Sequence, residues 1–217
     1  MRLVLASTSP ARLALLRAAG VEPEIVPSSV DEPAAVAAEE ARLGRPLDAD
    51  ETVLLLARAK AEAVAAERDV EDALVLGGDS AFAFDGSIHG KPHTPDRALD
   101  RWKAQRGREG VLHSGQWLVD GRTGRGDGIV TRALVRFAAD LTDAELAAYV
   151  ASGEPLAVAG AFTIDSLGGP FIDRIEGDPS TVVGLSLPAL RRLVRATGTE
   201  WTDLWHQGLH TGDTQGL

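Results

Sequence analysis

Cysteine is absent from this chain of 217 residues, which excludes disulfide frameworks, cysteine-based zinc sites and thiol nucleophiles. The chain needs no disulfide for stability, because a protein of this size buries roughly 70% of the surface that its unfolded form exposes. Long apolar runs are also lacking. None approaches the ~20 residues of a membrane span, and the apolar run at 3–6 is too short for a signal peptide. We therefore expect a cytoplasmic protein with no membrane partner.

Positive charge is in deficit. The chain has 22 Lys and Arg against 32 Asp and Glu, so its formal net charge is −10 at pH 7. Such a chain is a poor partner for nucleic acid, since non-specific binding depends on clustered cations that neutralise phosphates. A small anionic ligand in a locally cationic pocket is still compatible with this balance. With 44% hydrophobic residues, the composition is that of a globular protein.

Lysine is the scarce cation, with only three of the 22 basic residues: Lys60, Lys91 and Lys103. Lysine is a compact point charge on a flexible stem, whereas arginine is a planar fork, so the three positions can be ones where arginine would not serve. Codon bias with chance survival of three lysines explains the same count.

Strands and helices alternate in the first half of the chain, which is typical of α/β proteins. The expected elements are a strand at 3–6, a helix from the N-cap Ser9 to Gly20, a strand at 24–27, an alanine-rich stretch from Asp31, a helix at 51–68 capped by Asp50, and a strand at 74–76 that ends at Gly77-Gly78-Asp79.

The second half predicts more strands, and Asp85-Gly86 is a favoured two-residue hairpin turn. The expected elements are a hairpin at 81–89, a helix at 95–106, strands at 111–119 and 129–137 joined by a turn at 121–128, a helix from the capping box at Thr142, a strand at 171–176 and a last helix from Ser186. We expect one α/β domain at 1–198, with two lobes around a cleft, and a partly disordered tail at 199–217.

Arg12 lies where the first strand runs into a helix N-terminus, a junction whose free N–H groups attract anions. A cation in the first helical turn costs about 0.3–1 kcal/mol against the helix dipole, which makes sense if a phosphate binds there. The alternative is a solvated arginine on an exposed face.

Lys60 falls on the apolar stripe of the helix expected at 51–68. A buried ammonium needs a partner anion. An acidic side chain such as Glu32 would be a structural partner, and a ligand phosphate would be a functional one.

Asp79 follows a predicted strand and two glycines, which would let a substrate approach the backbone closely. Carboxylates at such places commonly bind a hard metal ion or act as a base, and the alternative is a turn residue. Lys91 follows the hairpin, which could bring it back toward Asp79.

Other motifs are weak or missing. His89 and His93 have the spacing of a helical zinc pair, as do His206 and His210, but each pair encloses a glycine. The chain has no P-loop and no Gly-x-Ser-x-Gly nucleophile elbow.

Seven blocks of the sequence resemble, in order, those of the Maf family of nucleoside triphosphate pyrophosphatases, over about residues 3–195. The blocks are Leu5-Ala6-Ser7-Thr8-Ser9-Pro10-Ala11-Arg12, Val30-Asp31-Glu32, Ala57-Arg58-Ala59-Lys60-Ala61, Gly77-Gly78-Asp79-Ser80, Gly90-Lys91-Pro92, Gly153-Glu154-Pro155-Leu156, and Ile175-Glu176-Gly177-Asp178 to Val183-Gly184-Leu185. The resemblance implies a mixed central sheet flanked by helices, related to the inosine triphosphate pyrophosphatases, a homodimer, and a divalent metal cation, Mg²⁺ or Mn²⁺.

The resemblance also implies site roles. Phosphate binding would fall to Ser7, Ser9, Arg12, Lys60 and Lys91. Glu32 would hold the metal, and Asp79 would be either the proton acceptor or a metal ligand, two roles that the sequence does not separate.

The departures from the family pattern fall at three positions, Ala11, Ser80 and Asp165, where neither familiar branch of the family matches. We assign these positions to base specificity. The His of the usual Gly-Arg-Thr-His block is also absent, since Gly107-Arg108-Glu109-Gly110 stands there.

The resulting hypothesis is hydrolysis of a non-standard or modified nucleoside triphosphate between its α- and β-phosphates, which yields a monophosphate and pyrophosphate. One alternative is a nucleotide-binding regulatory protein that affects septum formation, since the family has been linked to that process. An inosine triphosphate pyrophosphatase proper is disfavoured, because the first block lacks that family's Asn and Lys.

Overall fold

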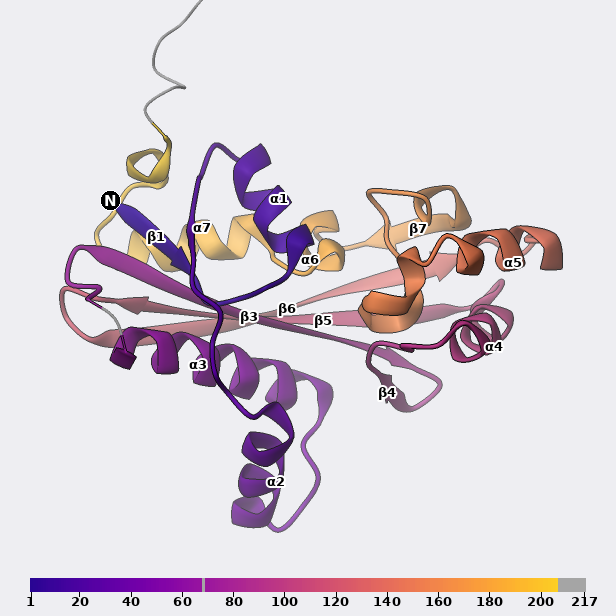
Figure 1. The fold of residues 1–217 in the computed structure, drawn as a ribbon, viewed down its shortest axis with the longest axis horizontal. Coiled ribbons are helices and arrows are strands. Elements are labelled where there is room, and N and C mark those ends of the chain that lie inside the picture. The colour runs from indigo at the N-terminus through magenta and orange to yellow at the C-terminus, as the bar shows by residue number, and fades with distance from the viewer. Residues whose placement is uncertain (68, 207–217) are drawn as a thin grey trace, which may run out of the picture.

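The computed structural model describes residues 1–67 and 69–206, which form a mixed seven-stranded sheet with helices on both faces (Figure 1). The strand order is β2-β1-β3-β5-β6-β7, and β4 pairs with one end of β3. β1 runs parallel to β2 and β3, whereas the other pairs are antiparallel. The predicted α/β fold with a mixed central sheet is confirmed.

The strands are β1 (Arg2–Leu5), β2 (Glu24–Ile25), β3 (Ala73–Phe84), β4 (Ser87–His89), β5 (Glu109–Asp120), β6 (Arg125–Phe137) and β7 (Ile172–Glu176). The α-helices are α1 (Pro10–Ala18), α2 (Glu32–Leu43), α3 (Ala49–Glu67), α4 (Pro95–Gln105), α5 (Asp143–Ala151), α6 (Pro179–Val183) and α7 (Leu187–Ala196). Four short 3₁₀ turns among the described residues are η1 (Glu154–Ala157), η2 (Ala159–Ala161), η3 (Gly169–Phe171) and η4 (Trp201–Leu204).

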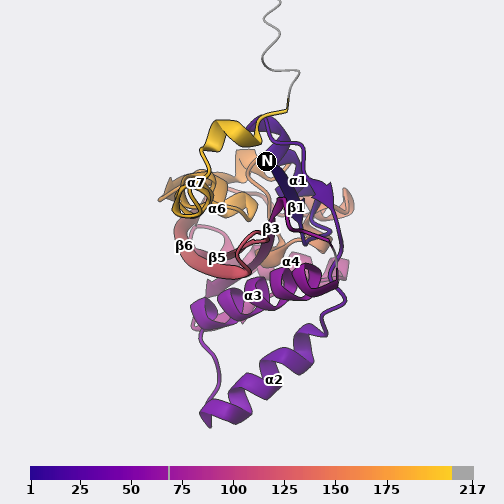
Figure 2. The same ribbon diagram turned by 90° about the vertical axis from the view of Figure 1, so that its left-hand side faces the viewer.

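Helices α1, α6 and α7 cover one face of the sheet and α3 covers the other, with α2 outside α3 (Figure 1, Figure 2). Leu16 and Leu190 pack between the sheet and the first group of helices. On the other face, Val64 of α3 packs against the sheet. An aromatic cluster around Trp102 and Phe137 fills the end of the sheet near α4 and α5. Apolar burial on both faces therefore holds the layers together.

Two predicted helix caps and the predicted hairpin turn are present in the structure. The Ser9 side chain accepts from the Arg12 amide at the start of α1, and Thr142 forms a complete capping box with Glu145. Asp85, at φ 53°, makes the β3–β4 turn together with the glycine that follows it. The turn between β5 and β6 is shorter than expected, because both strands extend into the predicted loop.

The prediction that a strand ends before Asp79 is wrong. β3 continues without interruption to Phe84, and Asp79 lies in mid-strand opposite Gly115. Gly77 does not turn the chain. Instead, a Cβ at this position would lie 2.0 Å from the carbonyl oxygen of Ala57 in α3, so the glycine permits close packing of the helix on the strand.

The predicted cap of α3 is also wrong. The helix begins at Ala49, and the side chain of Asp48, not Asp50, accepts from the Glu51 amide. Asp50 instead accepts from Nδ1 of His113 at 2.6 Å and from Arg132, so it ties the first turn of α3 to β5 and β6. The hydrogen bond with Arg132 holds the pKa of Asp50 below its ordinary value. The predicted helix end at residue 68 lies outside the described residues.

β3 has a gap along one edge. β1 pairs with residues 73–76 of β3 and β4 pairs with residues 82–84. In the described part of the chain, no strand pairs with the edge of 77–81 between them. The chain leaves β1 at this gap, after a last hydrogen bond from the Ala6 amide to the Leu76 carbonyl. The carboxyl end of β1 therefore lies beside an unpaired stretch of β3, and the carboxyl ends of strands are where ligands commonly bind in α/β sheets.

The predicted tail at 199–217 begins with ordered contacts. It includes η4, and Trp205 forms an isolated bridge with Val21. Residues 207–217, and His210 with them, lie outside the described residues. Of the helices that are described, none is both long and apolar enough to cross a membrane.

Candidate active site

The ammonium group of Lys60 lies between two carboxylates. Its Nζ is 2.7 Å from Oδ1 of Asp79 and 2.8 Å from Oε1 of Glu32. The lysine side chain is only 10% exposed, as its place on the apolar stripe of α3 predicts. Two carboxylates therefore neutralise the buried cation: Glu32, which the sequence suggests as its partner, and Asp79.

Two opposing effects act on the pKa of Asp79. Burial raises its pKa, and the nearby charges of Lys60 and Arg12 lower it, with a net value above the ordinary one. The carboxylate faces α3, since it lies two residues after Gly77 and successive side chains of a strand alternate between faces. Asp79 is thus held beside a lysine and close to an arginine, within the gap at the edge of β3.

Arg12 is buried, and no carboxylate pairs with it among the described residues. Its Nε donates to the Gly184 carbonyl at 2.8 Å, and its terminal nitrogens donate to the hydroxyls of Ser7 at 3.1 Å and Ser80 at 3.0 Å. All three acceptors are neutral, and burial lowers the pKa of the guanidinium. The alternative of a solvated, exposed arginine is therefore wrong, and an unpaired buried cation of this kind suits an incoming anion.

The two cations lie on opposite sides of β3. A Cβ at Gly78 would lie 3.0 Å from Nε of Arg12, so this glycine makes room for the guanidinium on one face while Gly77 admits α3 on the other. The glycines make room for these two contacts, and the expectation that they also admit a substrate stays a prediction. Arg12 and Lys60 consequently flank the unpaired edge from above and below the sheet.

Ser7 and Ser9 shape the loop between β1 and α1. The Ser7 hydroxyl accepts from the Ser9 amide at 3.2 Å as well as from Arg12. The Ser9 hydroxyl caps α1. The loop therefore curls around the first turn of the helix, where free amides and the helix dipole favour an anion.

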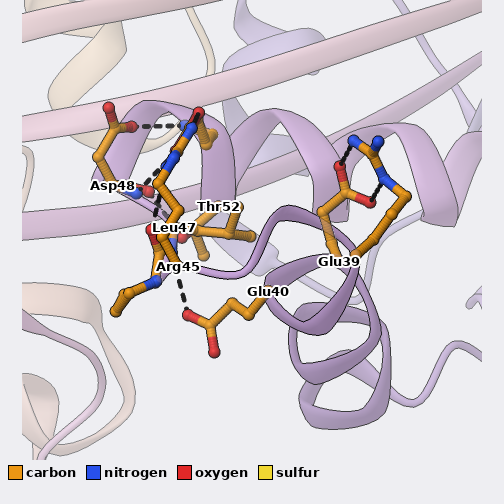
Figure 3. A network of polar contacts seen from close by, with 9 residues as sticks. Glu39, Glu40, Arg45, Leu47, Asp48 and Thr52 are labelled. Atoms are coloured by element: carbon orange, nitrogen blue, oxygen red, sulfur yellow. Dashed lines mark hydrogen bonds and ion pairs between the residues drawn. The ribbon is translucent and has the colours of Figure 1, made fainter.

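Glu32 reaches the site from a helix with no buried residue. α2 is held at its two ends: Glu32 contacts the lysine, and Oε1 of Glu40 accepts from the Leu47 amide at 3.0 Å (Figure 3). Arg45 adds an ion pair to Glu51 at 2.6 Å, and this pair lowers the pKa of Glu51 to about 2. Polar contacts in the α2–α3 connection thus fix the helix that presents Glu32.

Lys91 and Asp165 are not brought into contact with this group. Lys91 is exposed after β4 and makes no ion pair within the described residues, although β4 runs antiparallel to β3 and directs the chain back toward Asp79. Asp165 is exposed in the loop between η2 and η3, and Arg174 pairs with Glu176 instead. Ala11 is partly exposed in the first turn of α1.

Three functional candidates escaped the sequence analysis. The Gly184 carbonyl orients Arg12, and the Ser114 hydroxyl lies 3.4 Å from that of Ser80. Glu154 collects hydrogen bonds from the loop that carries Asp165. Gly184 and Glu154 lie in blocks that carry the family resemblance. Gly184 is 172 positions from Arg12, and Glu154 is 5 to 14 positions from its donors across irregular turns, so no local pattern predicts these contacts.

Two carboxylates at the gap, Glu32 and Asp79, are the candidate metal ligands among the described residues. Within 1–67 and 69–206, no cluster of three or more His, Asp or Glu is arranged to hold a metal ion. Glu32 and Asp79 both lie within ion-pair distance of Lys60 at the gap. Two carboxylates without further protein ligands suit Mg²⁺, which keeps water and substrate phosphates in its coordination sphere.

The fold and the site together define an α/β protein in which two buried cations and two carboxylates gather where β1 ends beside β3. The chain belongs to the family described as Maf-like protein, whose family model matches residues 2–197. It is 68% identical over 212 residues to the nucleoside triphosphate pyrophosphatase of Leifsonia xyli subsp. xyli, with 95% of this chain and 98% of that protein covered. Proteins of the same name are 53% identical in Salinispora tropica, with 100% and 92% covered, and 52% identical in Streptomyces coelicolor, with 94% of each chain covered. The resemblance found in the sequence is confirmed.

Proposed function

We propose that this chain is a nucleoside triphosphate pyrophosphatase that hydrolyses the bond between the α- and β-phosphates of non-standard or modified nucleoside triphosphates. The observation that carries the proposal is Arg12, a buried guanidinium with three neutral acceptors and no carboxylate partner in the part of the chain that the structure describes. The name shared by the relatives above gives the reaction that such an anion site would serve.

The reaction needs neutralisation of phosphate charge and alignment of an attacking water more than it needs covalent chemistry. Arg12 binds phosphate from the α1 side of the sheet, with Ser7 and Ser9 donating from the loop. Lys60 binds it from the α3 side, and the exposed Lys91 approaches over the hairpin. The substrate's phosphates then lie along the unpaired edge of β3.

Asp79 is the group placed to accept a proton from the attacking water or to hold a metal ion. Glu32 is its partner in the second role, and the pair has the hard oxygen donors that Mg²⁺ and Mn²⁺ prefer. When bound, the metal ion supplies charge neutralisation on the phosphates. With a metal ion bound to Glu32 and Asp79, the ammonium group of Lys60 would be available to a phosphate oxygen of the substrate.

Base preference is set by Ala11, Ser80 and Asp165, the positions that depart from both familiar branches of the Maf family. Ala11 leaves room for a purine, and Asp165 is acceptor-only when ionised, which favours the N–H groups of guanine. Ser80 contacts Arg12 directly, so it acts on base preference through the placement of the guanidinium. The enzyme is further proposed to act in the cytoplasm as a homodimer with two lobes around the site, with no nucleic acid or membrane partner.

The deciding experiment incubates the protein with a panel of ordinary and modified triphosphates, with Mg²⁺ or Mn²⁺, in ¹⁸O-labelled water. The expected products are pyrophosphate and a monophosphate that carries the label, since attack at the α-phosphorus places the water oxygen there. Release of orthophosphate would contradict the proposal. Tight nucleotide binding without turnover would favour the regulatory alternative.

A further inference from the structure

The loop at 163–168, which carries Asp165, donates hydrogen bonds to one carboxylate and, through the Thr163 amide, to the Tyr149 hydroxyl at 3.3 Å. Glu154, the first residue of η1, accepts hydrogen bonds from two side chains and two amides of this loop and from one side chain of α5. The donors are the hydroxyls of Tyr149 at 3.0 Å, Thr163 and Ser166 at 2.7 Å, and the amides of Leu167 at 3.3 Å and Gly168 at 3.1 Å.

These donors require a carboxylate. Glu154 has no cationic partner among the described residues, so neutral donors replace its hydration. Burial raises its pKa, but the hydrogen bonds from Thr163 and Ser166 outweigh this effect and keep it below the ordinary value. A glutamine of the same size would present an amide N–H₂ group to donors on one side, and at least one of them would lose its acceptor.

The loop is anchored to the face of the sheet on which Arg12 lies. Gly160 of η2 packs on Phe82, where a Cβ would lie 2.8 Å from the ring, and the Phe162 ring is centred 5.1 Å from that of Phe82. Phe82 lies two residues after Ser80 on β3, so both point to the same face. The chain therefore enters the loop directly beside the strand segment that contacts Arg12.

We propose that Glu154 is a positioning residue that holds the 163–168 loop so that Asp165 faces the base of a bound nucleotide. The proposal rests on the function proposed above. Glu154 acts on base discrimination and leaves the phosphate chemistry alone, because its hydrogen bonds go to the loop and to α5 and not to Arg12, Lys60 or Asp79.

The test compares Glu154→Gln with Glu145→Gln, a matched variant in which a carboxylate that caps α5 through Thr142 is lost instead. Each protein is assayed with guanosine and uridine triphosphates and with ribose 5′-triphosphate, which has the phosphates but no base. For Glu154→Gln we expect KM for the preferred nucleotide to rise about tenfold, as for a lost specificity contact. The ratio of kcat/KM between guanosine and uridine triphosphates should become smaller. The kcat, and the activity on ribose 5′-triphosphate, should stay within about twofold. Glu145→Gln should change none of these ratios.

An equal loss on ribose 5′-triphosphate, or unchanged base ratios in Glu154→Gln, would overturn the inference. If Glu154→Gln does not fold, Ser166→Ala removes one donor and leaves the carboxylate, and the same shift in KM is expected at smaller size. The proposed function fails separately, if the wild-type protein releases no pyrophosphate from any triphosphate. Calorimetric Kd values for the two nucleotides then replace KM, and an unchanged Kd ratio in the variant overturns the inference.

Discussion

The Nε of Arg12 donates to the carbonyl oxygen of Gly184, 172 positions away in the chain, at 2.8 Å. This carbonyl directly follows the last turn of α6, where the carbonyl end of the helix dipole favours a cation. The guanidinium is therefore oriented by neutral acceptors, and no carboxylate among the described residues forms an ion pair with it.

Replacing Arg12 with methionine should separate binding from stability. Removing an unpaired buried charge offsets the loss of three hydrogen bonds, so the free energy of unfolding should change by no more than about 1 kcal/mol. Pyrophosphate should raise the Tm of the wild-type protein and not that of Arg12→Met, since only binding to the folded state stabilises it. Equal Tm shifts in both proteins, measured by scanning calorimetry, would contradict an anion site at Arg12.

Asp79→Asn should keep the fold and lower kcat by at least ~100-fold, the low end of what a positioned acid or base contributes. The variant retains side-chain size and a hydrogen-bond acceptor for Lys60, so the β3–α3 contact should survive. Steady-state pyrophosphate release and the circular dichroism spectrum check the two halves of this prediction. Wild-type turnover in the variant would remove Asp79 from the catalytic group.

The lysines offer a matched comparison, because Lys91 and Lys103 are both exposed and neither forms an ion pair within the described residues. Lys91→Ala should lower kcat/KM at least ~10-fold through lost charge neutralisation, whereas Lys103→Ala should leave it unchanged. Lys60→Ala should also lower kcat/KM, and should in addition reduce stability, since it leaves Glu32 and Asp79 close together with no cation between them. Equal effects from Lys91 and Lys103 would support chance survival of the lysines.

The sequence predicts features that depend on neighbouring residues. Ser9 caps α1, Asp85 turns the hairpin, and Lys60 is buried on an apolar stripe, each as its local pattern indicates. Gly77 follows an apolar run, as a glycine that ends a strand would, and its role in helix packing becomes evident only once α3 is docked. The hydrogen bonds to Glu154 could not be predicted from the sequence, because the donors come together only when the chain from α5 to η3 has folded.

Glu154 should also make stability depend on pH in the acid range. Its folded pKa lies below the ordinary 4.5, so its contribution is present above the unfolded pKa and is lost as pH falls through the folded value. The difference in free energy of unfolding between wild type and Glu154→Gln should therefore be largest near neutral pH and shrink below about pH 4.5. Urea titrations of both proteins at a series of pH values measure it. A difference that stays constant into strong acid would show that the charge of Glu154 is not what holds the loop.

Asp165 should set the base preference of the enzyme. An ionised carboxylate only accepts hydrogen bonds, so it complements the N1–H and N2–H₂ groups of guanine and faces the acceptor oxygens of uracil and thymine unfavourably. Its exposure in the loop, with no ion-pair partner in the described structure, leaves the carboxylate available to a base. We expect guanosine-type triphosphates to be preferred over uridine and thymidine triphosphates by at least ~10-fold in kcat/KM, and Asp165→Gln, which offers both a donor and an acceptor, to narrow that ratio. Phosphate chemistry should persist in the variant, because Arg12, Lys60 and Asp79 are untouched. If uridine or thymidine triphosphate is the best substrate, and Asp165→Gln leaves the ranking as it is, then the base is recognised elsewhere.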